Sequence, residues 1–140
     1  MMGVGREHRL MKRGVLALLL AALLLSGCAA DNSGAAYRQV GTAEAIELME
    51  TETDYVILDV RTREEYEAAH IPGAICIPNE GIGGEAPDQL PDFGQLILVY
   101  CRSGNRSRQA AEKLSVLGYT NVVEFGGINS WTGDTVSGEN

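Results

Sequence analysis

The strongest constraint on the fold is an uninterrupted apolar run, LILVY, at positions 96–100. Its length and its branched side chains are typical of a parallel strand that is buried on both faces. A short polar loop follows, and apolar residues then recur at helical spacing from Ser107 to Leu117, before Gly118 ends the pattern. A buried strand that leads through a short loop into a helix predicts an α/β fold with a mainly parallel sheet.

The chain repeats this alternation of strand and helix from Tyr37 onward, so we expect one domain over residues 37–132. The pattern predicts five strands, at residues 37–40, 55–59, 74–77, 96–100 and 121–124. It predicts helices over residues 42–51 with Thr42 as N-cap, 62–69 with a capping box of Thr62 and Glu65, and 107–117, and a helical turn at 127–131. Residues 78–94 are expected to be mostly loop, with a turn of helix near Gln89 and Leu90, and the polar tail, 133–140, is expected to fray.

Cys101 directly follows the buried strand and is the candidate nucleophile. A loop that enters a helix N-terminus points backbone N–H groups inward, and the helix dipole adds partial positive charge there. A thiol in that field loses its proton more easily, and two arginines strengthen the effect. The candidate site is therefore catalytic Cys101 with an anion-binding loop formed by Arg102, Ser103, Gly104, Asn105, Arg106 and Ser107. A buried structural cysteine, the alternative, would need neither the glycine nor the guanidinium groups.

Four stretches of the chain resemble the motifs of the rhodanese family of sulfurtransferases. They are the loop at 101–107, the LDVR and EEY segments at 58–61 and 64–66, the HIPGA segment at 70–74, and the GGINSW segment at 126–131. The resemblance implies a three-layer α/β fold, in which helices cover both faces of a five-stranded, mainly parallel sheet. It also implies that the active loop lies at the carboxyl ends of the strands, where open α/β sheets bind ligands.

The activity that this resemblance implies is sulfur transfer through a persulfide on Cys101. The donor would be thiosulfate or another small sulfane or persulfide compound, and the acceptor a thiol or cyanide. No metal or organic cofactor is expected, because the sequence has no clustered His and Cys ligands.

Other functions stay open from the sequence. A cysteine phosphatase or arsenate reductase uses a similar loop, but Arg106 lies five positions after Cys101, one fewer than the resembled phosphatase signature has. A binding or sensing module of the same fold would need no turnover, although such modules usually lose the cysteine. A persulfide carrier that feeds a partner protein is an intermediate case.

The N-terminus carries the features of a signal peptide. Lys12 and Arg13 precede eleven apolar residues, 15–25, which as a helix would span only about 16 Å, roughly half of a bilayer core. The following LSGC resembles a bacterial lipobox, which implies cleavage after residue 27, lipidation of Cys28 and a tether over residues 28–36. We therefore expect an extracytoplasmic domain that is lipid-anchored to the cell membrane. An ordinary secretory signal is the alternative, and Met11 is an alternative start.

The charge balance indicates which partners to expect. Without residues 1–27 the chain has seven basic and eighteen acidic residues, so its formal charge is 7 − 18 = −11. This charge argues against nucleic acid and against electrostatic docking on anionic lipid, so the membrane contact would depend on lipid at Cys28. A monomer is expected.

The remaining motif residues are interpreted as structural. Asp59 is expected to be a structural anchor that pairs with loop amides or an arginine, and Arg61 is expected to have a similar role. His70 is expected to form a turn rather than act as a base, and Trp131 to pack in the core. Cys76 is expected at a packed apolar position, although export would make a Cys76–Cys101 disulfide conceivable.

Overall fold

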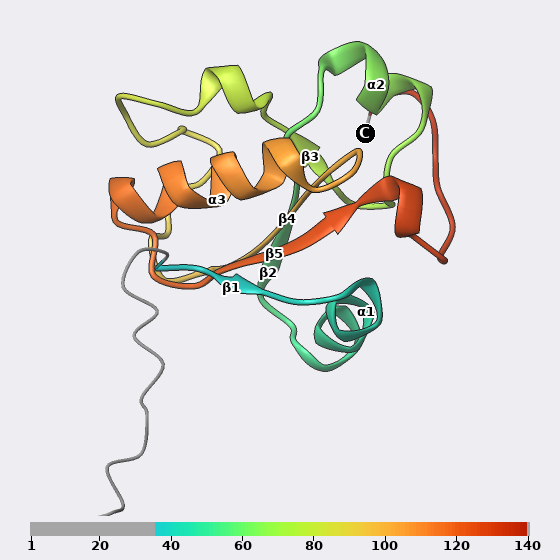
Figure 1. Ribbon diagram of the computed structural model, residues 1–140, viewed down its shortest axis with the longest axis horizontal. Helices are drawn as coiled ribbons and strands as arrows, with labels where there is room; N and C mark the ends of the chain where they lie inside the picture. Colours follow the sequence, from blue (N-terminus) through green and yellow to red (C-terminus); the bar gives the residue numbers. More distant parts are fainter. Residues whose placement is uncertain (1–35, 140) are drawn as a thin grey trace, which may run out of the picture. The chain divides into compact units, whose positions relative to one another are not determined.

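The computed structural model describes residues 36–139, which form a five-stranded parallel sheet (Figure 1). The strand order is β1-β5-β4-β2-β3, and every neighbouring pair is parallel. The strands are β1 (Arg38–Gln39), β2 (Tyr55–Asp59), β3 (Ile75–Cys76), β4 (Leu96–Cys101) and β5 (Val122–Gly127). The predicted fold class is confirmed.

Helices cover both faces of this sheet. The helices are α1 (Thr42–Thr51), α2 (Arg63–Ala68) and α3 (Asn105–Leu117), with the short 3₁₀ helices η1 (Asn79–Gly81) and η2 (Ile128–Ser130). Figure 1 shows α1 on one side of the sheet and α3 on the other. Among the described residues, no helix has the length and apolar content needed to cross a bilayer.

The central strand β4 is buried along its whole length, and its side chains alternate between two apolar clusters. Ile97, Val99 and Cys101 join the cluster that packs under α3. Leu98 and Tyr100 join the other cluster, which includes Ala45 of α1 and Tyr66 of α2. This period of two places the Cys101 side chain on the α3 face of the sheet.

A β-bulge extends β5 beside the end of β4. Val99 pairs with Glu124, but the next pair is Cys101 with Gly127, so β5 contains one extra residue between the two pairs. Gly126 lies in this bulge with a φ of 89°, a value that favours glycine. The bulge brings the backbone of Gly127 alongside Cys101, beyond the predicted strand end at residue 124.

Three local predictions about helices need correction. The N-cap of α1 is Gly41 rather than Thr42, and no side chain caps this helix. The helical turn after β3 is η1, which begins just after Pro78, whereas Leu90 is part of a simple turn in which its N–H donates to the carbonyl of Pro87. Helix α3 begins at Asn105, two residues earlier than predicted, because Gly104 adopts a left-handed conformation that turns the chain into the helix.

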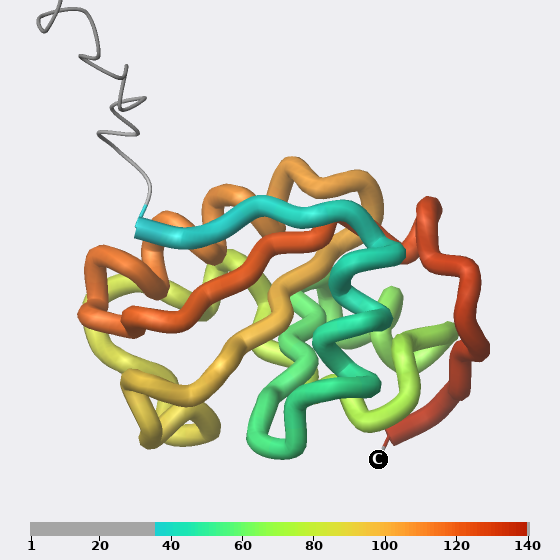
Figure 2. Tube along the Cα trace, turned by 90° about the horizontal axis from the view of Figure 1, so that it is seen from below, coloured from blue at the N-terminus to red at the C-terminus, as the bar shows by residue number. Residues whose placement is uncertain are grey.

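The prediction that the C-terminal tail frays is wrong for the residues that the structure describes. Val136 and His70 form an antiparallel bridge with backbone hydrogen bonds of 2.8 and 2.9 Å. The N–H of Gly138 donates to the carbonyl of Glu67 in α2, and Figure 2 shows the end of the chain returning beside the segment that follows this helix. Backbone pairing of this kind needs no apolar sequence pattern, so the polar composition gave no sign of it.

Candidate active site

Cys101 lies at the carboxyl end of β4, where the chain turns into α3. Cys101 is only 1% exposed. The backbone N–H of Gly104 donates to Sγ at 3.0 Å, and the backbone N–H groups of Ser103 and Ser107 also interact with the sulfur. Gly104 can turn its N–H inward because its φ is 106°, so the loop depends on glycine at this position.

These donors favour the thiolate. Burial by itself would raise the pKa of Cys101, but the Ser107 hydroxyl and the backbone N–H groups of Ser107, Gly104 and Ser103 outweigh burial and lower it. A thiol with a lowered pKa at a helix N-terminus is a nucleophile near neutral pH. The geometry agrees with the role predicted for Cys101.

Ser107 connects Cys101 to a buried carboxylate that sequence reasoning missed. The Ser107 Oγ lies 3.4 Å from the Cys101 Sγ and 2.6 Å from Oε1 of Glu124, and the N–H of Gly126 donates to the same Oε1 at 2.8 Å. Glu124 is 4% exposed. One signal was available, since Glu124 interrupts the apolar run VVEF and the period of a strand places it on the same face as Val122.

Arg106 contacts helix α2 rather than only the loop. Its guanidinium donates to both carboxylate oxygens of Glu65, with Nη1 2.7 Å from Oε2 and Nη2 3.0 Å from Oε1. Glu65 also forms a capping box with Thr62, so this prediction is confirmed. The side chain of Arg106 is therefore committed to an ion pair while its positive charge stays close enough to interact with Cys101.

The Glu65–Arg106 pair persists in acid. The hydrogen bonds from Arg106 lower the pKa of Glu65 from 4.5 to about 2, against the opposing effect of burial. Because the pKa is lower in the folded state than in the unfolded state, the pair stabilises the fold above about pH 4.5. This stabilisation is lost as the pH falls through about 2. The link between the loop and α2 is thus present throughout the neutral range.

The other predicted loop residues lie at the surface. Arg102, Ser103 and Asn105 are exposed, and the carbonyl of Arg102 accepts a hydrogen bond from the N–H of Asn129 at 3.2 Å. The loop therefore divides into two parts. Gly104 and Ser107 contact the sulfur, whereas the side chains of Arg102, Ser103 and Asn105 are open to an incoming anion.

Asp59 has the structural role that the sequence predicts, and its partner is Arg61, with which it forms a buried ion pair. Nη2 of Arg61 lies 2.6 Å from Oδ2 of Asp59 and 2.7 Å from the carbonyl of Ala69, at the end of α2. Burial alone would lower the pKa of Arg61, but the Asp59 carboxylate raises it above its usual value. The pair joins the end of β2 to α2, and so fixes the helix that carries Glu65.

His70 lies in the turn that the sequence predicts, fully buried and stacked on Tyr66 with 3.7 Å between ring centroids. Its Nδ1 is 2.8 Å from the carbonyl of Tyr66, and its backbone pairs with Val136. These contacts give His70 a structural role. Trp131 is partly buried against the apolar cluster that includes Ala45 of α1, and its ring centroid lies 6.2 Å from that of Phe125.

A disulfide between Cys76 and Cys101 is excluded by the sheet. Both thiols are free, and β2 separates β3, which carries Cys76, from β4, which carries Cys101. Two strand spacings place the two Cα atoms about 10 Å apart, beyond the roughly 7 Å that a disulfide can span. Their side chains also belong to clusters on opposite faces. Burial raises the pKa of Cys76, so it behaves as the packed thiol that was predicted.

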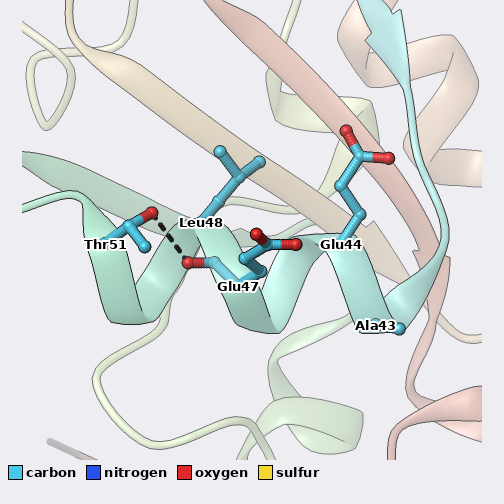
Figure 3. Close-up of a pocket in the computed structure, with 5 residues that line it drawn as sticks. All are labelled: Ala43, Glu44, Glu47, Leu48 and Thr51. Carbon is cyan, nitrogen blue, oxygen red and sulfur yellow. Dashed lines mark hydrogen bonds between the residues drawn. The ribbon is translucent and has the colours of Figure 1, made fainter.

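A surface depression on α1 does not belong to this site. Figure 3 shows its lining residues, Ala43, Glu44, Glu47, Leu48 and Thr51, which all come from one helix. Within residues 36–139, no group of three or more His, Cys, Asp or Glu residues could hold a metal ion. Cys28 and the predicted signal peptide lie outside the described residues.

Comparisons with known proteins agree with this geometry. The profile of the family described as Rhodanese-like domain matches residues 42–134. Over 71 residues the chain is 41% identical to thiosulfate sulfurtransferase PspE of Escherichia coli (strain K12), and the alignment covers 51% of this chain and 68% of that protein. Over 97 residues it is 33% identical to thiosulfate sulfurtransferase GlpE of Pseudoalteromonas translucida (strain TAC 125), covering 69% of this chain and 90% of that protein.

The solved structures include a similar chain described as a rhodanese with anions from E. coli. It is 37% identical, has a TM-score of 0.56, and the match covers 60% of this chain and 99% of that one. Some relatives are much longer than the shared region. The chain spans 20% of adenylyltransferase and sulfurtransferase UBA4 of Meyerozyma guilliermondii, at 36% identity, and 42% of the putative sulfur carrier protein YrkF of Bacillus subtilis (strain 168), at 40% identity.

Proposed function

Because the chain belongs to the Rhodanese-like domain family, we propose that it is a sulfurtransferase that carries sulfur on Cys101. One observation carries the proposal: the Gly104 N–H points at the Cys101 Sγ from 3.0 Å, at the entrance to α3. This contact stabilises a thiolate in a place where the loop can also bind a small anion. Two relatives named thiosulfate sulfurtransferase, and a related structure described with anions, support the same class of substrate.

The proposed reaction has two balanced steps. The Cys101 thiolate attacks the outer sulfur of thiosulfate, the bond between the two sulfur atoms of thiosulfate breaks, and sulfite leaves with the electron pair. A persulfide anion then remains on Cys101. In the second step a thiolate or cyanide attacks the outer sulfur, and the Cys101 thiolate leaves. Covalent catalysis thus divides one transfer into two easier steps, and the exposed side chains of Arg102, Ser103 and Asn105 would bind the sulfite oxygens.

A persulfide carrier is the second candidate, because the relative YrkF is named a putative sulfur carrier. Such a protein would receive sulfur from a protein persulfide rather than from thiosulfate. The cysteine phosphatase and arsenate reductase readings are weaker, since Arg106, which they would need at the anion, is engaged by both oxygens of Glu65.

The intact mass of the full chain, measured before and after addition of thiosulfate, tests the proposal. The wild type should gain about one sulfur atom, and cyanide should remove it and release thiocyanate. Cys101→Ser, which lacks the nucleophile, should gain nothing. No gain on folded, fully reduced wild type would reject thiosulfate as donor, and a gain from a persulfide donor alone would favour the carrier.

The cellular location is part of the same proposal. A lipid on Cys28 would hold the domain to the outer side of the cell membrane, and the acidic charge of the processed chain gives no electrostatic attraction to anionic lipid. Labelled fatty acid supplied to expressing cells should be incorporated into the wild type and not into Cys28→Ser, and the processed wild type should begin at residue 28. Equal labelling of both proteins, or none of the wild type, would argue against a lipid at this cysteine.

A further inference from the structure

The hydroxyl of Ser107 has more neighbours than its single proton can satisfy. Four polar atoms surround its Oγ: Glu124 Oε1 at 2.6 Å, Gly104 O at 3.0 Å, Gly126 O at 3.1 Å and Cys101 Sγ at 3.4 Å. The two carbonyls can only accept, and an ionised carboxylate and a thiolate can also only accept. The number of protons in the group formed by Cys101, Ser107 and Glu124 therefore decides which hydrogen bonds exist.

With two protons, this group can be fully hydrogen-bonded in two ways. In the first, the Cys101 S–H donates to Ser107 and the Ser107 O–H donates to the Glu124 carboxylate. In the second, protonated Glu124 donates to Ser107 and the Ser107 O–H donates to the Cys101 thiolate. With only one proton, thiolate and carboxylate would compete for the same hydroxyl, and two like charges would share a buried site.

We propose that Glu124 accepts, through Ser107, the proton that Cys101 gives up when it becomes a nucleophile. The S–H bond breaks as Ser107 Oγ takes the proton, and the proton of Ser107 moves to Oε1 of Glu124. One negative charge is thus shared between Cys101 and Glu124. Glu124 is a positioning residue that acts through Ser107, and the inference rests on the proposed role of Cys101 as nucleophile.

Burial favours such an internal acceptor. Cys101 is 1% exposed and Glu124 4%, so both groups lie away from the open surface. Among residues 36–139, no Lys or Arg forms an ion pair with Glu124, whose hydrogen-bond donors are the Ser107 hydroxyl and the Gly126 N–H. Protonation of Glu124 would relieve the cost of a buried carboxylate, and thiolate formation would leave the net charge unchanged.

The charged groups around this cluster are few. Arg106 of α3 interacts with Cys101, but Glu65 balances its charge. Arg108, also on α3, is a further cation near Glu124, since a Cβ placed on Gly104 would lie 3.9 Å from Nη1 of Arg108 and 3.8 Å from Oε1 of Glu124. The strand neighbours of Glu124 are Gln39 on β1 and Val99 on β4, which are uncharged. Arg102 lies exposed in the loop. Glu124 is the acidic group that the hydrogen bonds of Ser107 connect to the thiol.

The first test is a pH titration of the Cys101 thiolate in the full chain. The readout is the difference in ultraviolet absorbance between the wild type and Cys101→Ser. In Glu124→Gln the amide can still donate to Ser107, but it cannot accept a proton. We expect the wild-type thiolate absorbance to change little with pH across the neutral range, because the proton passes to Glu124 and not to the solvent, whereas in Glu124→Gln the thiolate should increase about tenfold for each pH unit below the midpoint. Glu112→Gln, an exposed change of the same charge on α3, should leave the titration unchanged.

Ser107→Ala distinguishes the shared proton from a simple charge effect. If the coupling runs through the hydroxyl, the effect of Glu124→Gln should shrink to less than half its size when Ser107 is already alanine. A wild-type thiolate absorbance that titrates with the same pH dependence as that of Glu124→Gln would overturn the inference, and so would an equal effect of Glu124→Gln with and without Ser107. The titration needs no sulfur donor. Its result can therefore contradict the role of Glu124 while thiosulfate loading supports the proposed function, or the reverse.

Infrared spectroscopy of the wild type provides a second test that needs no folded Glu124 variant. Where the thiolate absorbance has developed, a protonated carboxyl band should be present, and Cys101→Ser, which has no thiol proton to give, should lack it at the same pH. Thiolate without this band would overturn the inference.

Discussion

Replacing Gly127 by alanine should displace the loop that holds Cys101 and slow sulfur loading about a hundredfold. A Cβ at this position would lie 2.0 Å from the carbonyl oxygen of Arg102 and 2.5 Å from the nitrogen of Ser103. These are backbone atoms of the active loop, so they cannot rotate away as a side chain would. The φ of Gly127 is −150°, which alanine adopts freely, and the cost is therefore entirely steric.

The size of this effect follows from how closely the two segments pack. Overpacking of this kind costs about 1–3 kcal/mol of unfolding free energy and sometimes more. A loop moved by about 1 Å can cost about a hundredfold in rate. Urea unfolding followed by the fluorescence of Trp131, the single tryptophan of the chain, measures the first effect, and the mass gain with thiosulfate measures the second.

Gly81→Ala is the matched control for this prediction. No atom lies within 4 Å of the Cβ that it would add, so loading should be unchanged and stability equal or slightly higher. Normal loading by Gly127→Ala would show that the contact between β5 and the loop is not required.

Arg61→Met should destabilise the domain by about 3–5 kcal/mol, because it leaves the Asp59 carboxylate buried without its ion-pair partner. Asp59 is 0% exposed, and the guanidinium of Arg61 supplies three of the side-chain hydrogen bonds to its carboxylate, at 2.6–3.1 Å. The same substitution removes the hydrogen bond to Ala69, which ties α2 to the sheet. Chemical denaturation of Arg61→Met and wild type measures the difference.

A double variant separates the unpaired charge from the lost packing. Asp59→Leu combined with Arg61→Met removes both charges, so it should be less destabilised than Arg61→Met alone. If the double variant is destabilised by the full sum of the two single effects on the free energy of unfolding, the two charges are not coupled. The loss of stability in Arg61→Met would then come from packing.

The loop around Cys101 could be predicted because its signals are local. The apolar run of β4, the left-handed Gly104 and the start of α3 are neighbours in sequence, and each has its own preference. The Asp59–Arg61 pair is equally local, since its members are two residues apart. Sequence periodicity and turn chemistry therefore located Cys101 and its loop, although they placed the start of α3 two residues too late.

The partners that complete the site come from distant parts of the chain. Glu65 and Arg106 are 41 residues apart, and Ser107 and Glu124 are 17 apart. The contact with Glu124 also depends on the bulge at Gly126, which sets how far β5 runs beside β4. Helix and strand propensities carry no information on such pairings. The sequence therefore predicted Glu65 as a capping residue but did not predict its ion pair with Arg106.

The position of Cys76 one strand beyond β2 has a consequence for the lifetime of a loaded protein. Attack of a second thiol on a persulfide forms a disulfide and releases hydrosulfide, and this side reaction discharges the sulfur without an acceptor. Among the residues that the structure describes, the only other thiol is Cys76, which is held on the opposite face about two strand spacings away. If Cys101 carries sulfur as proposed, the supply of acceptor rather than self-discharge through Cys76 would determine how long the sulfur stays.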